Sequence, residues 1–307
     1  MLVIKIQGRL GNQMFQYAFA KRLQKEFYPN EEIIINYSKS KYSNKCAFCE
    51  KDNFFNLETL KSTYKMNINI IQKLLIYVYM LIRIIFKIKK DIKLQKFFNF
   101  FGIYFLQDAG ICDFKKSKMK NKIIYGYFAS EKFFELAKEE VLNDYKFEIE
   151  LDKEKEDFLR QIKENNSICI SIRRGDYLEN LNKNYFYVCD EQYYLQAIEK
   201  ANESIENPLY VVFSDDIDWV KNNIKIDGKC IYEDKNNKVN ETLYFMKNCK
   251  NFIISNSTFH WWAQYLSENK DKQVYAPSIW NNLDVSREIY LDDWNLIEVK
   301  KKNKMGE

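Results

Sequence analysis

Apolar stretches rich in β-branched residues alternate with helical stretches from about residue 166 to residue 280, and this alternation restricts the possible folds more than any other feature. Strands that alternate with helices in this way form a parallel sheet with helices on its faces. The chain also begins with this pattern, because LVIKIQ (2–7) is followed by a turn with two glycines, a helical pattern over 14–27 and the run EEIIIN (31–36). We therefore predict an α/β protein.

The length and the composition favour two such domains. A chain of 307 residues corresponds to about two domains of roughly 150 residues each. The regular alternation begins near residue 150, so we expect domains over 1–150 and 151–307. Hydrophobic residues make up 46% of the chain and charged residues 30%, which is typical of globular proteins and argues against disorder.

The net charge of the chain bears on its partners, and its cysteines bear on its compartment and on metal binding. The formal charge of +5 is a mild basic excess without the clustered Lys and Arg typical of nucleic-acid binding, so we expect no nucleic-acid partner. No secretory signal core precedes the first strand, and a reducing cytoplasm is the simplest compartment for the seven cysteines. Cys46 and Cys49 have the spacing of half a zinc site, but no second pair follows, which favours free thiols.

The segment INIIQKLLIYVYMLIRIIFKIKK (68–90) is apolar and basic. Its longest run without charge, Leu74–Ile82, has nine residues, whereas a membrane-spanning helix needs about 20. We interpret the segment as a basic amphipathic helix. Two roles stay open: a buried helix in a helical insertion over about 60–105, or an interfacial helix in peripheral contact with an anionic membrane.

Four polar loops follow predicted strands, and together they suit a nucleotide diphosphate. In open α/β sheets, ligands bind outside the carboxyl ends of the strands. The loops offer backbone amides, guanidinium groups, carboxylates and hydroxyls; they are Gly8–Gln13, Arg173–Tyr177, Ser214–Asp216 and Ser255–Thr258. Each loop alone is weak evidence, since a Gly-x-x-Gly turn or an exposed ion-pair cluster is common. Four such loops at the ends of successive strands are together much stronger evidence for a ligand site.

The side chains in these loops fit phosphate oxygens. Arginine stays charged, and its planar fork pairs with phosphate. Arg173 and Arg174 are adjacent in an extended segment and therefore point to opposite faces, so we expect one to hold the ligand and the other to brace the loop, with Asp176 holding an arginine in place. Ser257 and Thr258 lie where a strand turns into a helix, and a helix N-terminus with hydroxyls binds anions.

The chain resembles the α1,2-fucosyltransferases of glycosyltransferase family 11 over roughly residues 4–280. The motifs that carry the resemblance are GRLGNQMFQYAFA (8–20), GYFASEKFF (126–134), SIRRGDY (171–177), FSDD (213–216) and IISNSTFHWWAQYL (253–266). Their order and spacing fit the family. The segment from about 40 to 105 carries no matching motif.

The resemblance implies a GT-B-like fold, with two Rossmann-like domains facing a cleft: an acceptor-side N-terminal domain and a C-terminal domain that binds GDP-fucose. It implies an inverting transfer of L-fucose from GDP-fucose to the 2-hydroxyl of a terminal galactose or similar hexose, with no metal cofactor. The implied contacts are Arg173 and Arg174 with the pyrophosphate, Ser257 and Thr258 with phosphate oxygens, Asp215 or Asp216 with guanine, and Gly11 and Asn12 with the β-phosphate or fucose.

Two positions depart from the family pattern. Ser171 stands where the family has a histidine before the arginine pair, so that histidine is not essential to catalysis in this chain. His260, the only histidine, stands where the family often has serine, and we expect it to be an ordinary helix residue. The general base stays open: it must reach the acceptor hydroxyl within about 3 Å, directly or through one water, and Asp176 and Glu131 are candidates. The departing phosphate is a further group that could assist late in the reaction.

We expect a cytoplasmic enzyme, free or peripheral on the inner face of the membrane, that modifies a lipid-linked glycan such as a surface polysaccharide or O-antigen. Asp216-Ile217-Asp218 imitates a metal-binding motif, so a metal-dependent glycosyltransferase with another nucleotide sugar is one alternative. A nucleotide-sugar-binding protein without catalysis is another, because of Ser171. The sequence does not name the acceptor, the base or the oligomeric state.

Overall fold

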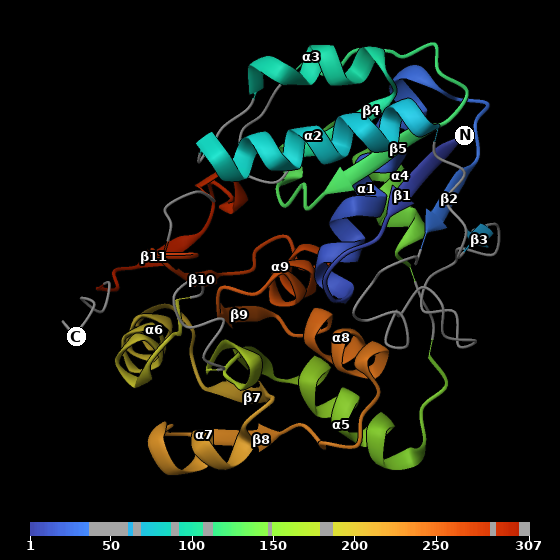
Figure 1. Cartoon of the computed structure of the whole chain (residues 1–307). Coiled ribbons are helices and arrows are strands. Elements are labelled where there is room, and N and C mark those ends of the chain that lie inside the picture. Colours follow the sequence, from blue (N-terminus) through green and yellow to red (C-terminus); the bar gives the residue numbers. More distant parts are fainter. Residues whose placement is uncertain are drawn as a thin grey trace. The chain divides into compact units, whose positions relative to one another are not determined.

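The chain forms two compact units in the computed structural model, Met1–Phe147 with Ser286–Ile289 and Glu148–Val285 with Tyr290–Glu307. We call them unit 1 and unit 2. The structure describes residues 1–36, 61–63, 69–86, 92–106, 113–146, 149–178, 187–282 and 287–300 (Figure 1). Cys46 and Cys49 lie outside the described residues.

Unit 1 contains a five-stranded parallel sheet with the order β3-β2-β1-β5-β4. Its strands are β1 (Leu2–Lys5), β2 (Ile33–Asn36), β3 (Lys61–Thr63), β4 (Ile103–Leu106) and β5 (Lys122–Gly126). β1 lies in the centre, where Val3 is opposite Ile34 on one side and Ile123 on the other. Both faces of a parallel sheet are usually covered by helices, and the buried apolar run Leu2–Ile4 in β1 agrees with this.

The helices of unit 1 follow the strands in chain order. α1 (Leu10–Phe27) packs on β1, β2 and β5. α2 (Ile70–Phe86) and α3 (Ile92–Phe100) connect β3 to β4 and lie side by side (Figure 1). After β5, two 3₁₀ turns, η2 (Glu131–Phe133) and η3 (Glu135–Ala137), lead into α4 (Lys138–Asp144). Another 3₁₀ turn, η5 (Arg287–Ile289), belongs to this unit.

An aromatic cluster holds α1 against the segment that follows β5. Phe19 of α1 is fully buried and stacks on Phe128, with ring centroids 4.0 Å apart. Phe114 and Phe133 contact the same ring, at centroid distances of 4.7 Å and 6.1 Å. Aromatic pairs in such arrangements add about 0.5–1.5 kcal/mol each beyond the area that they bury. Phe19 is therefore a central packing residue of unit 1.

Unit 2 contains a six-stranded parallel sheet with the order β11-β10-β9-β6-β7-β8. Its strands are β6 (Asn166–Ile172), β7 (Pro208–Ser214), β8 (Lys229–Tyr232), β9 (Asn251–Ile254), β10 (Val274–Pro277) and β11 (Asn295–Ile297). Its helices are α5 (Lys153–Glu164), α6 (Glu191–Ser204), α7 (Ile217–Asn223), α8 (Val239–Lys247) and α9 (Thr258–Tyr265), and the 3₁₀ turn η4 (Gly175–Leu178) follows β6.

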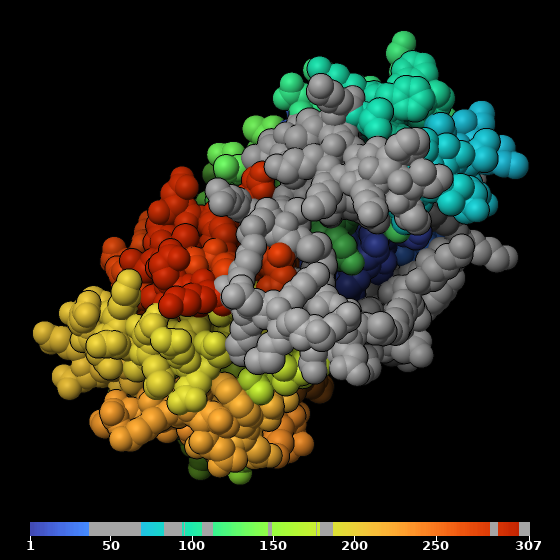
Figure 2. Space-filling view, turned by 60° about the vertical axis from the view of Figure 1, so that its left-hand side comes forward, coloured from blue at the N-terminus to red at the C-terminus, as the bar shows by residue number. Residues whose placement is uncertain are grey.

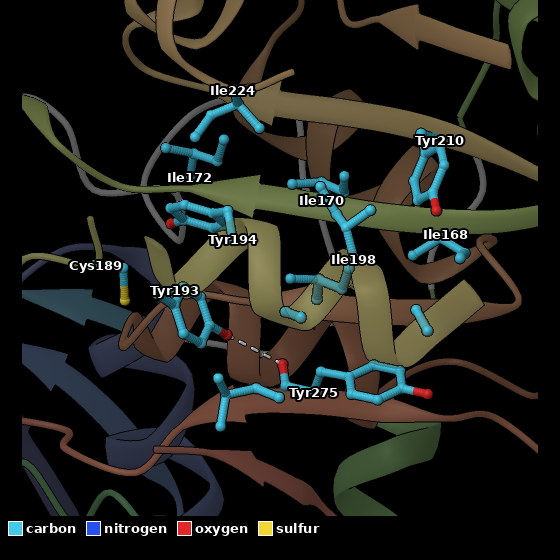
Figure 3. Close-up of a cluster of buried hydrophobic side chains, with 14 of the residues drawn as sticks. Ile168, Ile170, Ile172, Cys189, Tyr193, Tyr194, Ile198, Tyr210, Ile224 and Tyr275 are labelled. Atoms are coloured by element: carbon cyan, nitrogen blue, oxygen red, sulfur yellow. Dashed lines mark hydrogen bonds between the residues drawn. The ribbon is translucent and has the colours of Figure 1, made fainter. Parts of the chain in front are cut away.

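Helix α6 covers one face of this sheet, and β6 supplies the facing side chains (Figure 3). Ile168, Ile170 and Ile172 alternate along β6 and pack against α6, whose buried residues include Tyr194 and Ile198. Successive residues of a strand point to opposite faces, so Ser171 and Arg173 belong to the other face of the sheet. The alternation of side chains along β6 therefore decides which helices the two arginines contact.

The α/β class predicted from the sequence is confirmed in both units. One predicted boundary is wrong: α1 begins at Leu10, so Gly11 and Asn12 form its first turn and do not lie in a loop. The tight turn at Gly8 allows this early start, because its φ of +70° is favoured only by glycine. A Cβ on Gly8 would lie 2.4 Å from Asn12 Nδ2, so a larger residue would displace the helix start.

The segment after β5 becomes helical through the two 3₁₀ turns, and Ser130 caps the first of them, its Oγ accepting the Lys132 N–H at 3.3 Å. Within the described part of the chain, no helix combines the length and the apolarity that crossing a membrane requires.

Replacing Phe19 with alanine should lower the free energy of unfolding of unit 1 by about 3–5 kcal/mol, because the change leaves a cavity among three aromatic rings. Urea unfolding, followed by near-ultraviolet circular dichroism, measures the loss. Leu136→Ala is the matched control, since Leu136 is 55% exposed and its truncation should cost little. Equal losses in both variants would contradict the packing role of Phe19.

Candidate active site

The carboxyl ends of β6, β7 and β9 carry most of the predicted site residues. β6 lies between the other two strands, with Ile172 opposite Ser214 of β7 and Ser171 opposite Ile254 of β9. All three strands run in the same direction, so the loops that follow them meet at one edge of the sheet. This edge brings together Arg173, Arg174, Asp215, Asp216, Ser257 and Thr258.

Asp215 holds the backbone and one guanidinium group of the arginine pair. Its Oδ2 lies 2.7 Å from Nη1 of Arg173, and its Oδ1 accepts the backbone N–H of Arg174 at 2.9 Å. Gly175 comes so near that a Cβ at this position would lie 2.8 Å from Asp215 Oδ2. The glycine after the two arginines is therefore needed for close approach to this carboxylate.

Arg174 is fixed by a second set of partners. Its guanidinium carbon lies 3.6 Å from the centroid of the Trp219 ring, and its Nε lies 3.4 Å from Oδ2 of Asp216. Asp216 also begins α7, because its Oδ1 accepts the Trp219 N–H at 3.2 Å. The stacked and paired position of Arg174 suits the loop-bracing role expected for one of the two arginines.

These contacts bear on two other predictions. Both oxygens of Asp215 and both oxygens of Asp216 already accept hydrogen bonds or ion pairs from the protein. The contact of either carboxylate with guanine stays a prediction, and it would share an oxygen with an existing partner. The Asp216-Ile217-Asp218 sequence acts here as a helix start, since Asp216 is the N-cap of α7.

The N-terminus of α9 faces the same edge. Ser257 is the N-cap, and its hydroxyl makes no capping hydrogen bond to the helix backbone, while Thr258 is the first helical residue. The first N–H groups of an α-helix have no partner within the helix, and the macrodipole makes this end positive. Together with Arg173 and Arg174, this helix start gives the edge the electrostatics of a phosphate site.

His260 lies in α9, close to Arg173. Its Nδ1 is 2.8 Å from Oγ of Ser255, and Ser255 is attached to β6 through the hydrogen bond from its N–H to the Ser171 carbonyl at 3.2 Å. Burial and the positive charge of Arg173 lower the pKa of His260 to about 3. The imidazole is therefore neutral at physiological pH and adds no charge beside the arginines.

Asn256 links three loops and was not among the predicted site residues. Its Nδ2 donates to the carbonyls of Tyr187 and Trp280, both at 2.7 Å, and its own carbonyl accepts the Tyr177 hydroxyl at 3.0 Å. Its side chain is almost fully buried. The only sequence signal was an asparagine between two serines in a strand-end loop, and its partners are about 24 to 79 residues away along the chain.

Glu233 follows β8 at the same carboxyl edge and was not predicted either. Burial raises the pKa of this carboxyl to about 7, although hydrogen bonds from the Thr242 hydroxyl and, at 3.3 Å, from Asn237 Nδ2 oppose the shift. These bonds tie the end of β8 to the start of α8. Glu233 thus stabilises the loop at the outer end of the edge.

The remaining predicted residues lie elsewhere or are only partly described. Gly11 and Asn12 belong to unit 1, in the first turn of α1. Asp176 lies in η4, but its side chain is outside the described part of the structure. Glu131, the other candidate base, is in unit 1 and forms an ion pair with Lys138 at 2.7 Å.

Comparison with known proteins decides the family. A profile described as "Glycosyl transferase family 11" matches residues 1–298, nearly the whole chain. The chain belongs to this family. It is therefore a glycosyltransferase, and the resemblance seen in the five motifs is confirmed.

The family 11 chain has bacterial and mammalian relatives. It is 27% identical to the O-antigen biosynthesis glycosyltransferase WbnK of Escherichia coli, over 94% of this chain and 98% of that protein. It is 27% identical to an alpha-1,2-colitosyltransferase of the same species, over 91% of this chain and 92% of that protein. The galactoside alpha-(1,2)-fucosyltransferase 2 of Bos taurus is 27% identical over 46% of this chain and 44% of that protein.

Among solved structures, the chain is similar to fucosyltransferase NodZ from Bradyrhizobium. The TM-score is 0.49 at 11% sequence identity, over 86% of this chain and 93% of that chain.

The imidazole of His260 should not titrate between pH 8 and pH 5, because its pKa is about 3 in the folded protein. His260 is the only histidine of the chain, so a single Hε1 resonance in the proton NMR spectrum reports its state. The same protein in concentrated urea is the control and should titrate near the ordinary value of about 6.5. A folded-state midpoint near 6.5 would show that the ring is accessible and not held beside Arg173.

The lowered pKa of His260 also makes the stability of the folded protein depend on pH. The unfolded chain takes up a proton near pH 6.5 and the folded chain does so only near pH 3. The contribution of neutral His260 to stability is therefore complete above pH 6.5 and declines as the pH falls toward 3.

Proposed function

We propose that the protein transfers L-fucose from GDP-fucose to the 2-hydroxyl of a terminal galactose, or a similar hexose, of a glycan. Membership in family 11 and the names of the mammalian relatives support fucose and the 2-position. The relative WbnK supports a bacterial O-antigen or related lipid-linked glycan as the acceptor. The observation that carries the proposal in the structure is the edge of unit 2 where Arg173, Arg174 and the start of α9 converge.

The reaction would be a single displacement with inversion. The acceptor oxygen attacks the anomeric carbon from the face opposite the nucleotide, and the bond from that carbon to the β-phosphate oxygen breaks, with its electron pair leaving on GDP. The proton of the acceptor hydroxyl passes to a base, for which Asp176 is our candidate. Negative charge grows on the β-phosphate in the transition state, so fixed positive groups at that oxygen lower the barrier.

The structure suggests how the two arginines divide this work. Arg174 is held by the Trp219 ring and the Asp216 carboxylate, which suits a residue that maintains the loop. Arg173 pairs with Asp215 through Nη1 and lies close to His260 of α9, so its guanidinium group is beside the helix start that also suits phosphate. We therefore assign the pyrophosphate contact to Arg173. Ser257 and Thr258 would add a hydroxyl and backbone N–H groups, and no resident metal is required in this scheme.

Colitose is a second candidate for the transferred sugar. The colitosyltransferase aligns with 91% of this chain, whereas the mammalian fucosyltransferases align with 46%. Colitose lacks the 3-hydroxyl of L-fucose but keeps the same ring configuration elsewhere. The arginine chemistry at the diphosphate would be identical for both sugars, so only contacts with the sugar separate the two candidates.

Donor assays with purified protein test the proposal. The protein is incubated with GDP-fucose or GDP-colitose and a panel of galactosides, with and without EDTA, and NMR identifies the linkage of any product. An α1,2-linked fucoside formed in EDTA supports the proposal, and preference for GDP-colitose supports the second candidate. Strict dependence on a divalent ion with another nucleotide sugar, or GDP binding without turnover, would establish one of the alternatives from the sequence.

Replacing Arg173 with lysine should slow transfer by about 100- to 1,000-fold, since lysine keeps the charge but lacks the fork that pairs with Asp215 and phosphate together. Initial rates at saturating donor measure the effect, and Arg173→Ala should be at least as slow. The control is Arg160→Lys, because Arg160 is an exposed arginine of α5 in the same unit. Near-normal rates in Arg173→Lys would remove this residue from the proposed role.

A further inference from the structure

Helix α2 is apolar on two opposite faces. Its inner face, which includes Leu75, Ile76 and Tyr79, packs against α3, β4 and β5. The Tyr79 ring is central there, with centroid distances of 4.8 Å to Phe98 and 4.6 Å to Phe105. These inner residues recur every three or four positions, as expected for one side of a helix that covers a core.

The opposite face of α2 is apolar as well, and it is exposed. Ile70 is 79% exposed, Leu74 61% and Tyr77 63%. Among the α2 side chains that the structure describes, the exposed apolar ones are Ile70, Ile71, Leu74, Tyr77, Val78, Leu81 and Ile82. These positions also recur every three or four residues, so they form a second stripe along the helix.

The sequence interpreted this segment as a basic amphipathic helix, and the structure adds that two of its faces are apolar. Residues 70–86 contain only two charged residues, Lys73 and Arg83. A helix with so much apolar surface is normally buried in a large core or in a membrane. Here the core occupies one side only, and the outer stripe stays exposed in the described structure.

Helix α3 extends the exposed apolar surface. It lies against α2 through Tyr79 and Phe98, and it exposes Leu94, Phe97 and Phe100. Atoms of both helices are visible at the surface in Figure 2 (cyan and teal). We call the exposed apolar residues of α2 and α3 together the outer surface of the α2–α3 pair.

The segment that contains α2 and α3 is strongly basic in sequence. Residues 61–106 contain nine basic residues and one acidic residue, Asp91, whereas the whole chain has 48 basic and 43 acidic residues. Lys73 of α2 and Lys96 of α3 are exposed among the apolar residues. The mild excess of the whole chain thus conceals a strongly basic segment.

We propose that the outer surface of the α2–α3 pair docks on an anionic lipid bilayer, with α2 lying in the plane of the interface. The apolar stripe would enter the boundary between headgroups and acyl chains, and the basic residues would contact anionic headgroups. Exposed Tyr77 has the amphipathic side chain typical of such interfaces.

Charge complementarity favours a lipid bilayer over other occupants. Two copies of this chain would bring two basic surfaces together, and like charges repel. A bilayer with anionic lipids supplies both the opposite charge and an apolar layer along the whole helix. The benefit to catalysis rests on the proposed function, because a membrane-docked enzyme would meet a lipid-linked acceptor in the same plane.

A triple substitution tests the apolar part of the surface. In Leu74→Ser/Tyr77→Ser/Leu81→Ser, we expect the affinity for vesicles of phosphatidylcholine with phosphatidylglycerol to fall by about tenfold or more. Flotation of the full-length protein with vesicles measures this affinity. Leu136→Ser/Val239→Ser/Leu296→Ser is the matched control, because it removes three exposed apolar side chains elsewhere, and it should bind as the unchanged protein does.

The basic part is tested by Lys73→Gln/Lys96→Gln. Each lysine near an anionic membrane contributes about fivefold in affinity, so the pair should weaken binding by about 25-fold at low salt. Binding of the unchanged protein should also decrease with added salt and be weak on vesicles of phosphatidylcholine alone. Lys235→Gln/Lys270→Gln, which changes two exposed lysines of unit 2, should have no such effect.

Several results would overturn the proposal. Circular dichroism first verifies that each variant is folded. No binding of the unchanged protein to anionic vesicles, or equal binding by the triple variant and its control, would refute lipid docking. Sedimentation that shows a dimer lost only in the triple variant, without a change in vesicle binding, would assign the surface to a second copy.

The vesicle assay contains neither donor nor acceptor, so its failure is separate from a failure of the proposed function. Transfer to a soluble galactoside should be unchanged in the triple variant. Vesicle binding without any transfer would refute the proposed function alone, and transfer without vesicle binding would refute the docking surface alone.

Discussion

The carboxylate of Asp215 is the contact on which the geometry of the candidate active site depends. It accepts from the Arg173 side chain and from the Arg174 backbone, so one residue at the end of β7 orients the loop after β6. Loss of this carboxylate would leave a largely buried guanidinium group without its partner, which is far more costly than loss of an exposed ion pair. Gly175 is part of the same constraint, because any side chain there would collide with Asp215.

The parallel order of the strands makes that contact possible and brings the two arginine–aspartate ion pairs and the start of α9 to one edge. β6 lies between β7 and β9, so the arginine pair, the two aspartates and the start of α9 are neighbours although they are separated by about 40 to 85 residues in sequence. Neutral His260 packs beside Arg173 without adding repulsion, since burial and that arginine keep its pKa near 3. The edge thus combines a fixed cationic fork with a helix N-terminus, which suits a diphosphate leaving group.

Unit 1 combines a closed aromatic core with an apolar surface that the core does not cover. Its core is aromatic and closed around Phe19, while the connection between β3 and β4 carries a helix with more apolar surface than the core covers. That same connection has almost no acidic residues to balance its lysines and arginines, since Asp91 is the only acidic residue between residues 61 and 106. The five sequence motifs of family 11 lie outside this connection, which agrees with the docking role that we propose for it.

Strand–helix alternation and the polar residues at strand ends were sufficient to predict the α/β class and to select Arg173, Arg174, Asp215 and Asp216, because local periodicity and charge are properties of short segments. The alternation of side chains along an extended segment also predicted that the two arginines would have different surroundings. The short strands β4 and β11 were not predicted, since each has only three or four residues and no flanking pattern distinguishes it.

Tertiary structure alone decided which groups meet. The stacking of Arg174 on Trp219, the three loops joined by Asn256 and the buried carboxyl of Glu233 all involve partners from separate elements. Tertiary packing also decided that only one face of α2 is covered, because periodicity marks apolar positions but cannot show how many of them a core will reach. The sequence by itself determined the helices, the strands and the charged groups at their ends. The pairing order of the strands determined the site, since residues that are remote in sequence come close together only in the folded chain.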